Sequence, residues 1–141
     1  LVELEVLSPM RYCSNKVTLH TDSSLLPKRK LAWASWNYDA GLQKEKATLT
    51  YNMNILAGIE SNKDVLVTLN DEGKIDPTKI LRTASYDHPV LNQQMIASQD
   101  RHAEISGVNR THYCGAYWRY GFHEDGVVSA LDVCKTFGVG L

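Results

Sequence analysis

LAWASWNYDAGLQKEKATLTYNMN, residues 31–54, is the stretch that determines the kind of fold. Its two ends, 31–38 and 47–54, combine aromatic and β-branched residues with alternating polar and apolar positions, which is the pattern of a β-strand. Residues 39–46 between them hold a glycine and charges of both signs, as expected of a hairpin connection. The sequence therefore predicts two antiparallel strands joined by a loop.

Elements on both sides of this block extend the prediction. Strand patterns recur in three further segments: 16–22, 64–69 and 80–86. The last third of the chain has a different character, with a helix, a short strand and an amphipathic helix expected at 93–106, 111–118 and 126–137. This order predicts the α+β class: a mostly antiparallel sheet followed by helix, short strand and C-terminal amphipathic helix.

The composition excludes several functional classes. With 43% hydrophobic and 22% charged residues, the chain is typical of a soluble globular protein that buries a core. A net charge of −1 gives no electrostatic reason to expect nucleic acid or an anionic membrane, and no apolar run has the roughly 20 residues of a transmembrane segment. Three widely spaced cysteines, Cys13, Cys114 and Cys134, favour buried thiols in a reducing, cytoplasmic compartment.

A glycine-rich turn near the C-terminus carries the most chemical information. Residues 113–116, YCGA, read as the end of an apolar strand, and residues 120–126, YGFHEDG, lead into a helix. A helix N-terminus presents unpaired N–H groups and a partial positive charge, and Gly126 would let a flat ligand approach the backbone because no Cβ intervenes. The alternative is structural: Glu124 and Asp125 cap the helix and the glycines serve sharp turns.

Residues 114–130 resemble the C-terminal flavin-contacting motif of flavin-containing amine oxidases, phytoene desaturases and protoporphyrinogen oxidases. In that superfamily a Gly-aromatic-x-Glu-Gly-Ala segment opens the final helix, whose N-terminus points at the pyrimidine side of the isoalloxazine ring. Gly115 corresponds to the glycine at the strand end and Gly121-Phe122 to the Gly-aromatic pair. Glu124 and Gly126 correspond to the Glu-Gly step, with Asp125 as one extra residue between them.

A second block makes the resemblance more specific. A bacterial branch of the superfamily, known as predicted NAD/FAD-binding proteins, combines GAYW-x-YGFHEDG with an upstream LHTD and AWASWNY. This chain carries the first at 115–126 and the second at 19–22 and 32–38, so the resemblance covers essentially its whole length. It implies that residues 1–110 are part of the substrate-binding domain and that residues 111–141 are the last strand and helix of the FAD-binding domain.

The resemblance implies FAD as the cofactor. The expected cofactor-binding residues are Gly115, Ala116, Gly121, Phe122, His123, Glu124, Asp125, Gly126 and Val127. The backbone N–H groups of Gly126 and Val127 are the expected donors, placed to stabilise negative charge that develops on flavin reduction. Relatives with a covalent flavin use a cysteine in the segment corresponding to 86–90, and none stands there, so noncovalent FAD is expected.

The resemblance also implies a small-molecule, apolar substrate that loses a hydride from a C–N or C–C bond. Phe122 takes the place of an aromatic residue that forms one wall of the substrate cage, and residues 86–90 resemble the segment of the opposite wall. The residues expected on the substrate side are Trp36, Asp87, His88, Pro89, Trp118 and Phe122. No catalytic residue is assigned, because the lysine that many amine oxidases place near the flavin falls upstream of Leu1.

The chain lacks the Gly-x-Gly-x-x-Gly fingerprint, which belongs to the first strand–helix unit of such enzymes. The chain also begins with Leu1 and has its first methionine at Met10, so we expect a fragment whose FAD binding and catalysis need an N-terminal part. The alternative function is a noncatalytic α+β binding module that holds no flavin.

Two other patterns favour ordinary structure over a site. His20 and Asp22 are the closest approach to a metal-binding pattern, but the five histidines lack the three or four locally spaced ligands of a zinc site. The basic run at 28–30 fits a solvated loop better than an anion or membrane contact.

Overall fold

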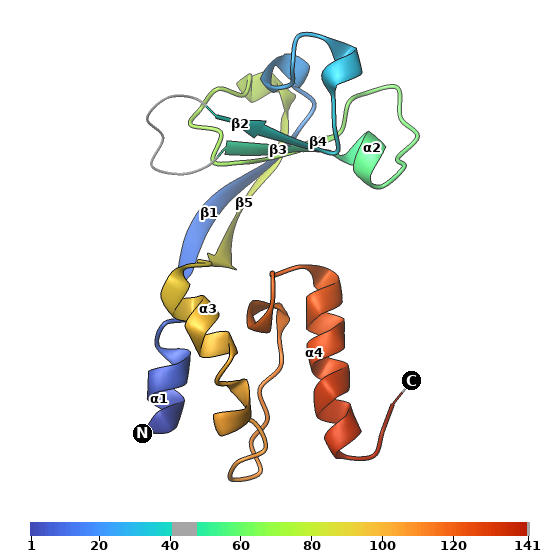
Figure 1. Ribbon diagram of the computed structural model, residues 1–141. Helices are drawn as coiled ribbons and strands as arrows, with labels where there is room; N and C mark the ends of the chain where they lie inside the picture. The colour runs from blue at the N-terminus through green and yellow to red at the C-terminus, as the bar shows by residue number, and fades with distance from the viewer. Residues whose placement is uncertain (41–47, 141) are drawn as a thin grey trace. The chain divides into compact units, whose positions relative to one another are not determined.

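The computed structural model describes residues 1–40 and 48–140 (Figure 1). The chain forms two compact units, one made of Leu1–Cys13 with His88–Leu141 and the other of Ser14–Asp87. The α+β class is confirmed, because helices occur together with a five-stranded antiparallel sheet. The predicted boundary at residue 110 separates a substrate-binding part from an FAD-binding part. It concerns function, which the two compact units do not test, so it stays a prediction. Among the described residues, no helix combines the length and the apolar character needed to cross a bilayer.

The sheet has the strand order β2-β3-β4-β1-β5. Its strands are β1 (Tyr12–His20), β2 (Trp36–Asp39), β3 (Thr48–Asn52), β4 (Leu66–Leu69) and β5 (Ile80–Pro89). The predicted antiparallel pairing within 31–54 is confirmed, since Trp36 of β2 lies opposite Tyr51 of β3. Most of the predicted hairpin connection, residues 41–46, and the first residue of the predicted strand at 47 lie outside the described residues.

The two faces of the sheet differ in polarity. Apolar residues that lie opposite one another form two rows across four strands: Val17, Leu69, Leu49 and Tyr38, and next to them Leu19, Val67, Tyr51 and Trp36. Trp36 and Tyr38 are exposed and the other six are half-buried. The opposite face carries residues that are at most 3% exposed, among them Thr18, His20, Thr50 and Thr68. This unit therefore buries the polar face of its sheet and leaves the apolar face accessible.

A chain of hydrogen bonds makes burial of the polar face possible. The backbone N–H of Asp22 donates to Nδ1 of His20 at 3.1 Å, so the proton of the neutral imidazole sits on Nε2. That nitrogen donates to Oγ1 of Thr68 at 2.7 Å, and the hydroxyl of Thr50 lies 2.8 Å from that of Thr68. Because these buried groups satisfy one another, the desolvation cost of each is offset.

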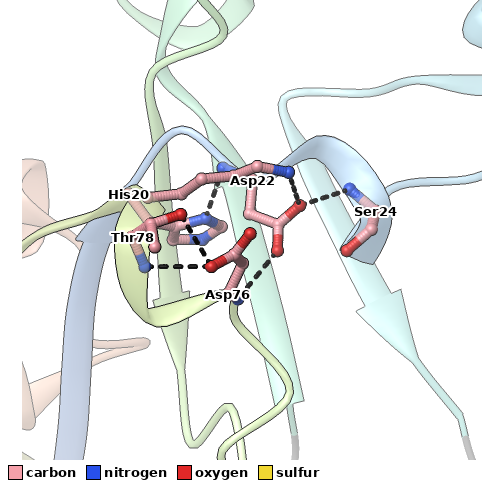
Figure 2. Close-up of polar contacts among 6 residues, drawn as sticks. His20, Asp22, Ser24, Asp76 and Thr78 are labelled. Carbon is pink, nitrogen blue, oxygen red and sulfur yellow. Dashed lines mark hydrogen bonds and ion pairs between the residues drawn. The ribbon is translucent and has the colours of Figure 1, made fainter.

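Asp22 joins the end of β1 to the segment that leads into β5, as Figure 2 shows. Its carboxylate accepts hydrogen bonds from the backbone N–H groups of Ser24 at 3.2 Å and Asp76 at 2.9 Å, and from the ammonium of Lys79 at 3.0 Å. Burial raises the pKa of the Asp22 carboxyl, but these donors outweigh burial and hold that pKa well below its ordinary value. The carboxylate therefore stays ionised and caps both the 3-10 helix η1 (Ser23–Leu25) and the turn before η3 (Pro77–Lys79).

The other unit is mainly helical. It contains α1 (Val2–Leu7), α3 (Gln93–Gln99), α4 (His123–Thr136) and the 3-10 helices η4 (His102–Glu104) and η5 (Ala116–Trp118). Val6, Ile105 and Trp118 form its buried core. The His102 ring packs edge-on against Trp118 with centroids 4.3 Å apart, and its Nε2 donates to the carbonyl of Tyr113 at 2.7 Å. This contact orders the segment that precedes the glycine-rich turn.

The strand predicted at 31–38 is wrong for its first half. The 3-10 helix η2 occupies Lys30–Ala32, and β2 begins only at Trp36. The indole of Trp33 donates to the carbonyl of Pro27 at 2.8 Å, which folds this segment back on the preceding loop. The strand predicted at 47–54 also ends early, because the side chain of Asn52 accepts from the N–H of Ile55 and starts the short helix α2 (Met53–Leu56).

The short strand predicted at 111–118 is wrong. A tight turn returns the chain at Asn109 and Arg110, both with positive φ, and an isolated bridge joins Val108 to Thr111. Side chains then take the backbone carbonyls that a neighbouring strand would use: His102 binds Tyr113, and Gln99 binds the two carbonyls on either side of Trp118. The segment is therefore a loop ending in η5.

Both predicted helices have different limits. The helix expected at 93–106 ends at Gln99, where the next backbone bond, from Arg101 to Ser98, spans three residues and tightens the chain into a 3-10 turn. The helix expected at 126–137 begins three residues earlier, at His123.

The His20 contacts predict a pH dependence of stability. Burial lowers the pKa of the His20 imidazole below its ordinary value, against the raising effect of the Asp22 and Asp71 carboxylates. His20 therefore becomes protonated near pH 6.5 in the unfolded chain but stays neutral at that pH in the folded chain. As a result, the free energy of unfolding falls as the pH drops below about 6.5. We expect the free energy of unfolding from urea titrations to decline by at most about 1.4 kcal/mol per pH unit from this group.

The His20→Gln chain serves as the comparison. It should be less stable at neutral pH but lose less stability between pH 7 and pH 5 than the wild-type chain. Equal pH slopes for the two chains would contradict the assignment of a neutral, hydrogen-bonded His20.

Candidate functional site

The glycine-rich turn is fixed against the start of α4. The N–H of Gly115 donates to the hydroxyl of buried Ser129 at 3.1 Å. The side-chain amide of Gln99 donates to the carbonyl of Tyr117 at 2.9 Å and to that of Arg119 at 2.7 Å. The turn is therefore held from two sides, by α3 and by α4, and does not rely on its own backbone bonds alone.

The three glycines of the predicted motif differ in what they do for this chain. Gly115 has φ +153°, and a Cβ there would lie 2.3 Å from the ring of Tyr117. Gly121 has φ +89°, a conformation that side chains disfavour. Gly126 has ordinary helical geometry, and a Cβ there would meet only Ala116, at an acceptable 3.8 Å. The backbone conformation and the neighbouring atoms therefore require glycine at positions 115 and 121, but not at position 126.

The predicted backbone donors are wrong. Because α4 begins at His123, the N–H of Gly126 already donates to the carbonyl of Phe122, at 3.3 Å, and the N–H of Val127 falls within the helix. The N–H groups without an intrahelical acceptor belong to the first turn, His123 to Asp125. The positive end of the helix dipole is thus one turn earlier than expected.

The two acids at the helix start have separate roles. Oδ2 of Asp125 accepts the N–H of Phe122 at 3.0 Å, which is the side-chain-to-backbone half of a capping box. The structural alternative is therefore correct for Asp125. Glu124 is exposed, and no hydrogen bond or ion pair of its side chain is seen among the described residues.

The residues predicted on the substrate side belong to both units. Trp36 and Asp87 lie in the sheet unit, whereas His88, Pro89, Trp118 and Phe122 lie in the helical unit. Trp36 and Phe122 are 50% and 53% exposed, so their rings are available for contact. Trp118 is 7% exposed and packs in the core, where it also lines a groove of about 410 Å³ with Leu91, Ile96, Gln99, Asp100, Arg119 and Tyr120.

The apolar sheet face contains a groove that sequence reasoning missed. Its volume is about 270 Å³, and it is lined by Val17, Leu19, Val67, Arg82, Ala84 and Tyr86. The signal was present in the sequence, since Val17 and Leu19 alternate with Thr18 and His20. That alternation defines two faces, but it does not say which of them the protein buries.

The thiols and the candidate metal ligands form no chemical centre in residues 1–40 and 48–140. None of the three cysteines forms a disulfide, and the expectation of buried thiols is wrong, because Cys114 is exposed and Cys13 and Cys134 are half-buried. Cys114 lies in the loop that replaces the strand predicted at 111–118. No group of three or more His, Cys, Asp or Glu side chains in this part of the chain could hold a metal ion.

No family model matches this chain, and no curated protein matches it. The resemblance to flavin-containing amine oxidases therefore rests on the residue blocks at 19–38 and 115–126, and it stays a prediction.

The capping contact predicts unequal effects of the two acids. Asp125→Ala removes the acceptor for the N–H of Phe122 and should destabilise the chain by about 1 kcal/mol. Glu124→Ala, the matched control on the same turn, removes only a charge near the helix dipole and should cost about 0.5 kcal/mol or less. Urea unfolding of both variants measures the difference, and equal losses would show that Asp125 has no special capping role.

Proposed function

We propose that this chain is the C-terminal part of an FAD-dependent oxidoreductase of the amine-oxidase type. Residues 115–127 would contact noncovalent FAD, and the sheet of residues 14–87 would belong to the substrate-binding domain. The observation that carries the proposal is Gly126. Neither its φ angle nor its neighbours in this chain require a glycine there, and glycine costs a helix about 1 kcal/mol relative to alanine.

A flat ligand explains that glycine. A Cβ on Gly126 would lie 3.8 Å from Ala116, itself a small residue, so little side-chain bulk would separate a ring from the backbone at the start of α4. The first-turn N–H groups and the helix dipole favour negative charge beside them. These residues fit the pyrimidine edge of a flavin. FAD, when bound, supplies the acceptor for a hydride from a C–N or C–C bond.

The role of the first turn of α4 is electrostatic. Its N–H groups are held in place by the capping contact of Asp125 before any ligand arrives, so they need no rearrangement to face developing charge. Phe122, which is half exposed beside them, can pack against substrate or ring.

An apolar small molecule is the substrate class that the sheet supports. Its accessible face carries two rows of aliphatic and aromatic side chains, with Trp36 and Tyr38 at 50% and 65% exposure. Large accessible apolar surfaces commonly mark binding sites. The same face would serve the alternative, a noncatalytic α+β binding module, and the two functions differ in whether flavin is held.

Other features agree with an enzyme of the cytoplasm. Three cysteines without a disulfide suit a reducing compartment. The net charge of −1 provides no attraction for nucleic acid. Because the dinucleotide fingerprint is absent from the sequence, we expect firm FAD binding only in the longer parent protein, with weak or no binding by residues 1–141 alone.

Gly126→Ala tests the proposal by separating folding from cofactor binding. In the 141-residue chain the substitution should stabilise the helix, raising the free energy of unfolding by about 0.5–1 kcal/mol. In the parent protein the added methyl group should weaken FAD binding roughly tenfold or more, by overpacking against the ring. Urea titration and fluorimetric FAD titration measure the two effects.

Gly140→Ala is the matched control, because Gly140 also lacks a positive φ and has open space around it but lies beyond α4. It should leave FAD affinity unchanged. If Gly126→Ala stabilises the chain and FAD affinity stays the same, Gly126 does not face the flavin and the proposed site is wrong.

A further inference from the structure

Residues 28–33, KRKLAW, form a loop that we call the basic loop. Leu31 at its centre is 103% exposed, the highest value among the exposed large apolar side chains of the described chain. Lys28, Arg29 and Lys30 directly precede it and are all exposed. A fully exposed leucine is unremarkable alone, and so is a short basic run, but here they share one tip.

The basic loop is held in shape by its own contacts. The backbone N–H groups of Ala32 and Trp33 donate to the carbonyls of Arg29 at 2.9 Å and Lys30 at 3.0 Å. The Trp33 indole is fixed on the carbonyl of Pro27, and the ammonium of Lys30 lies 5.4 Å from the Trp33 ring centre. Because the tip is already ordered, little conformational freedom is lost when it contacts a partner.

Among residues 1–40 and 48–140, no carboxylate forms an ion pair with Lys28, Arg29 or Lys30. Lys28, Lys30 and Lys79 line a shallow cavity of about 400 Å³ together with Asp22 and Trp33. The Asp22 carboxylate is engaged by Lys79 at 3.0 Å and by backbone N–H groups. The cations of the basic loop therefore face solvent, even though the whole chain has a net charge of −1.

We propose that the basic loop docks on the surface of an anionic lipid bilayer. Leu31 enters the boundary between headgroups and acyl chains, Lys28, Arg29 and Lys30 contact lipid phosphates, and the amphipathic Trp33 lies at headgroup level. An acidic protein would need an apolar pocket beside its carboxylates to engage both features, whereas any anionic bilayer supplies phosphates and an apolar layer together. The contact is peripheral and does not depend on flavin. A bilayer is also where apolar small molecules partition.

Co-sedimentation of the 141-residue chain with vesicles tests this proposal. Vesicles of phosphatidylcholine with phosphatidylglycerol should bind the chain, and binding should weaken as salt is raised. Vesicles of phosphatidylcholine alone should bind it much less. Lys28→Gln and Arg29→Gln should each weaken binding roughly fivefold, and Leu31→Asn roughly tenfold through the lost apolar contact.

Leu56→Asn and Lys63→Gln are the matched controls, since both residues are exposed in the same unit and line neither the basic loop nor its cavity. They should leave vesicle binding unchanged. The proposal is overturned if anionic vesicles do not bind the chain, if the controls weaken binding as much as the loop variants, or if Leu31→Asn has no effect. Competition by inorganic phosphate at constant ionic strength would point to a pocket for a free anion and would overturn it as well.

Discussion

The hydrogen bond from His20 to Thr68 is the contact on which the sheet unit depends. It allows the polar face of the sheet to be buried, because the imidazole, Thr68 and Thr50 satisfy one another away from water. The apolar face is accessible as a consequence. Asp22 extends the same network to the loops after β1 and before β5, and the first of these continues into the basic loop. One buried network thus determines which surfaces this unit presents.

In the helical unit, side chains bind the backbone groups that a neighbouring β-strand would otherwise bind. His102 and Gln99 bind the carbonyls around the glycine-rich turn, and Ser129 binds the N–H at its start. The turn is consequently preorganised beside the first turn of α4. Within that arrangement the backbone at Gly115 and Gly121 requires glycine, whereas no φ angle or close neighbour in the described chain requires it at Gly126. A ligand lying close to the helix N-terminus would explain the glycine at position 126.

The sequence predicted the class of fold and most strands, because alternation and turn residues are local signals. It could not predict which face is buried, since this depends on the loops that Asp22 brings together. The strand prediction is wrong for residues 31–35, because the side-chain bond from Trp33 to Pro27 that folds this segment back leaves no periodic pattern in the sequence. The helix start was misplaced although its signal was present: Asp125 stands three residues after Phe122, the spacing of a capping contact. Distinguishing Gly126 from Gly115 required coordinates.

If a flavin lies against the start of α4, as proposed, the absorption spectrum of the purified longer parent protein should reveal it. We expect a yellow protein whose flavin band survives dialysis and whose N-terminal part contains Gly-x-Gly-x-x-Gly. A folded parent protein that stays colourless after incubation with FAD and dialysis would contradict the claim and favour a binding module without flavin.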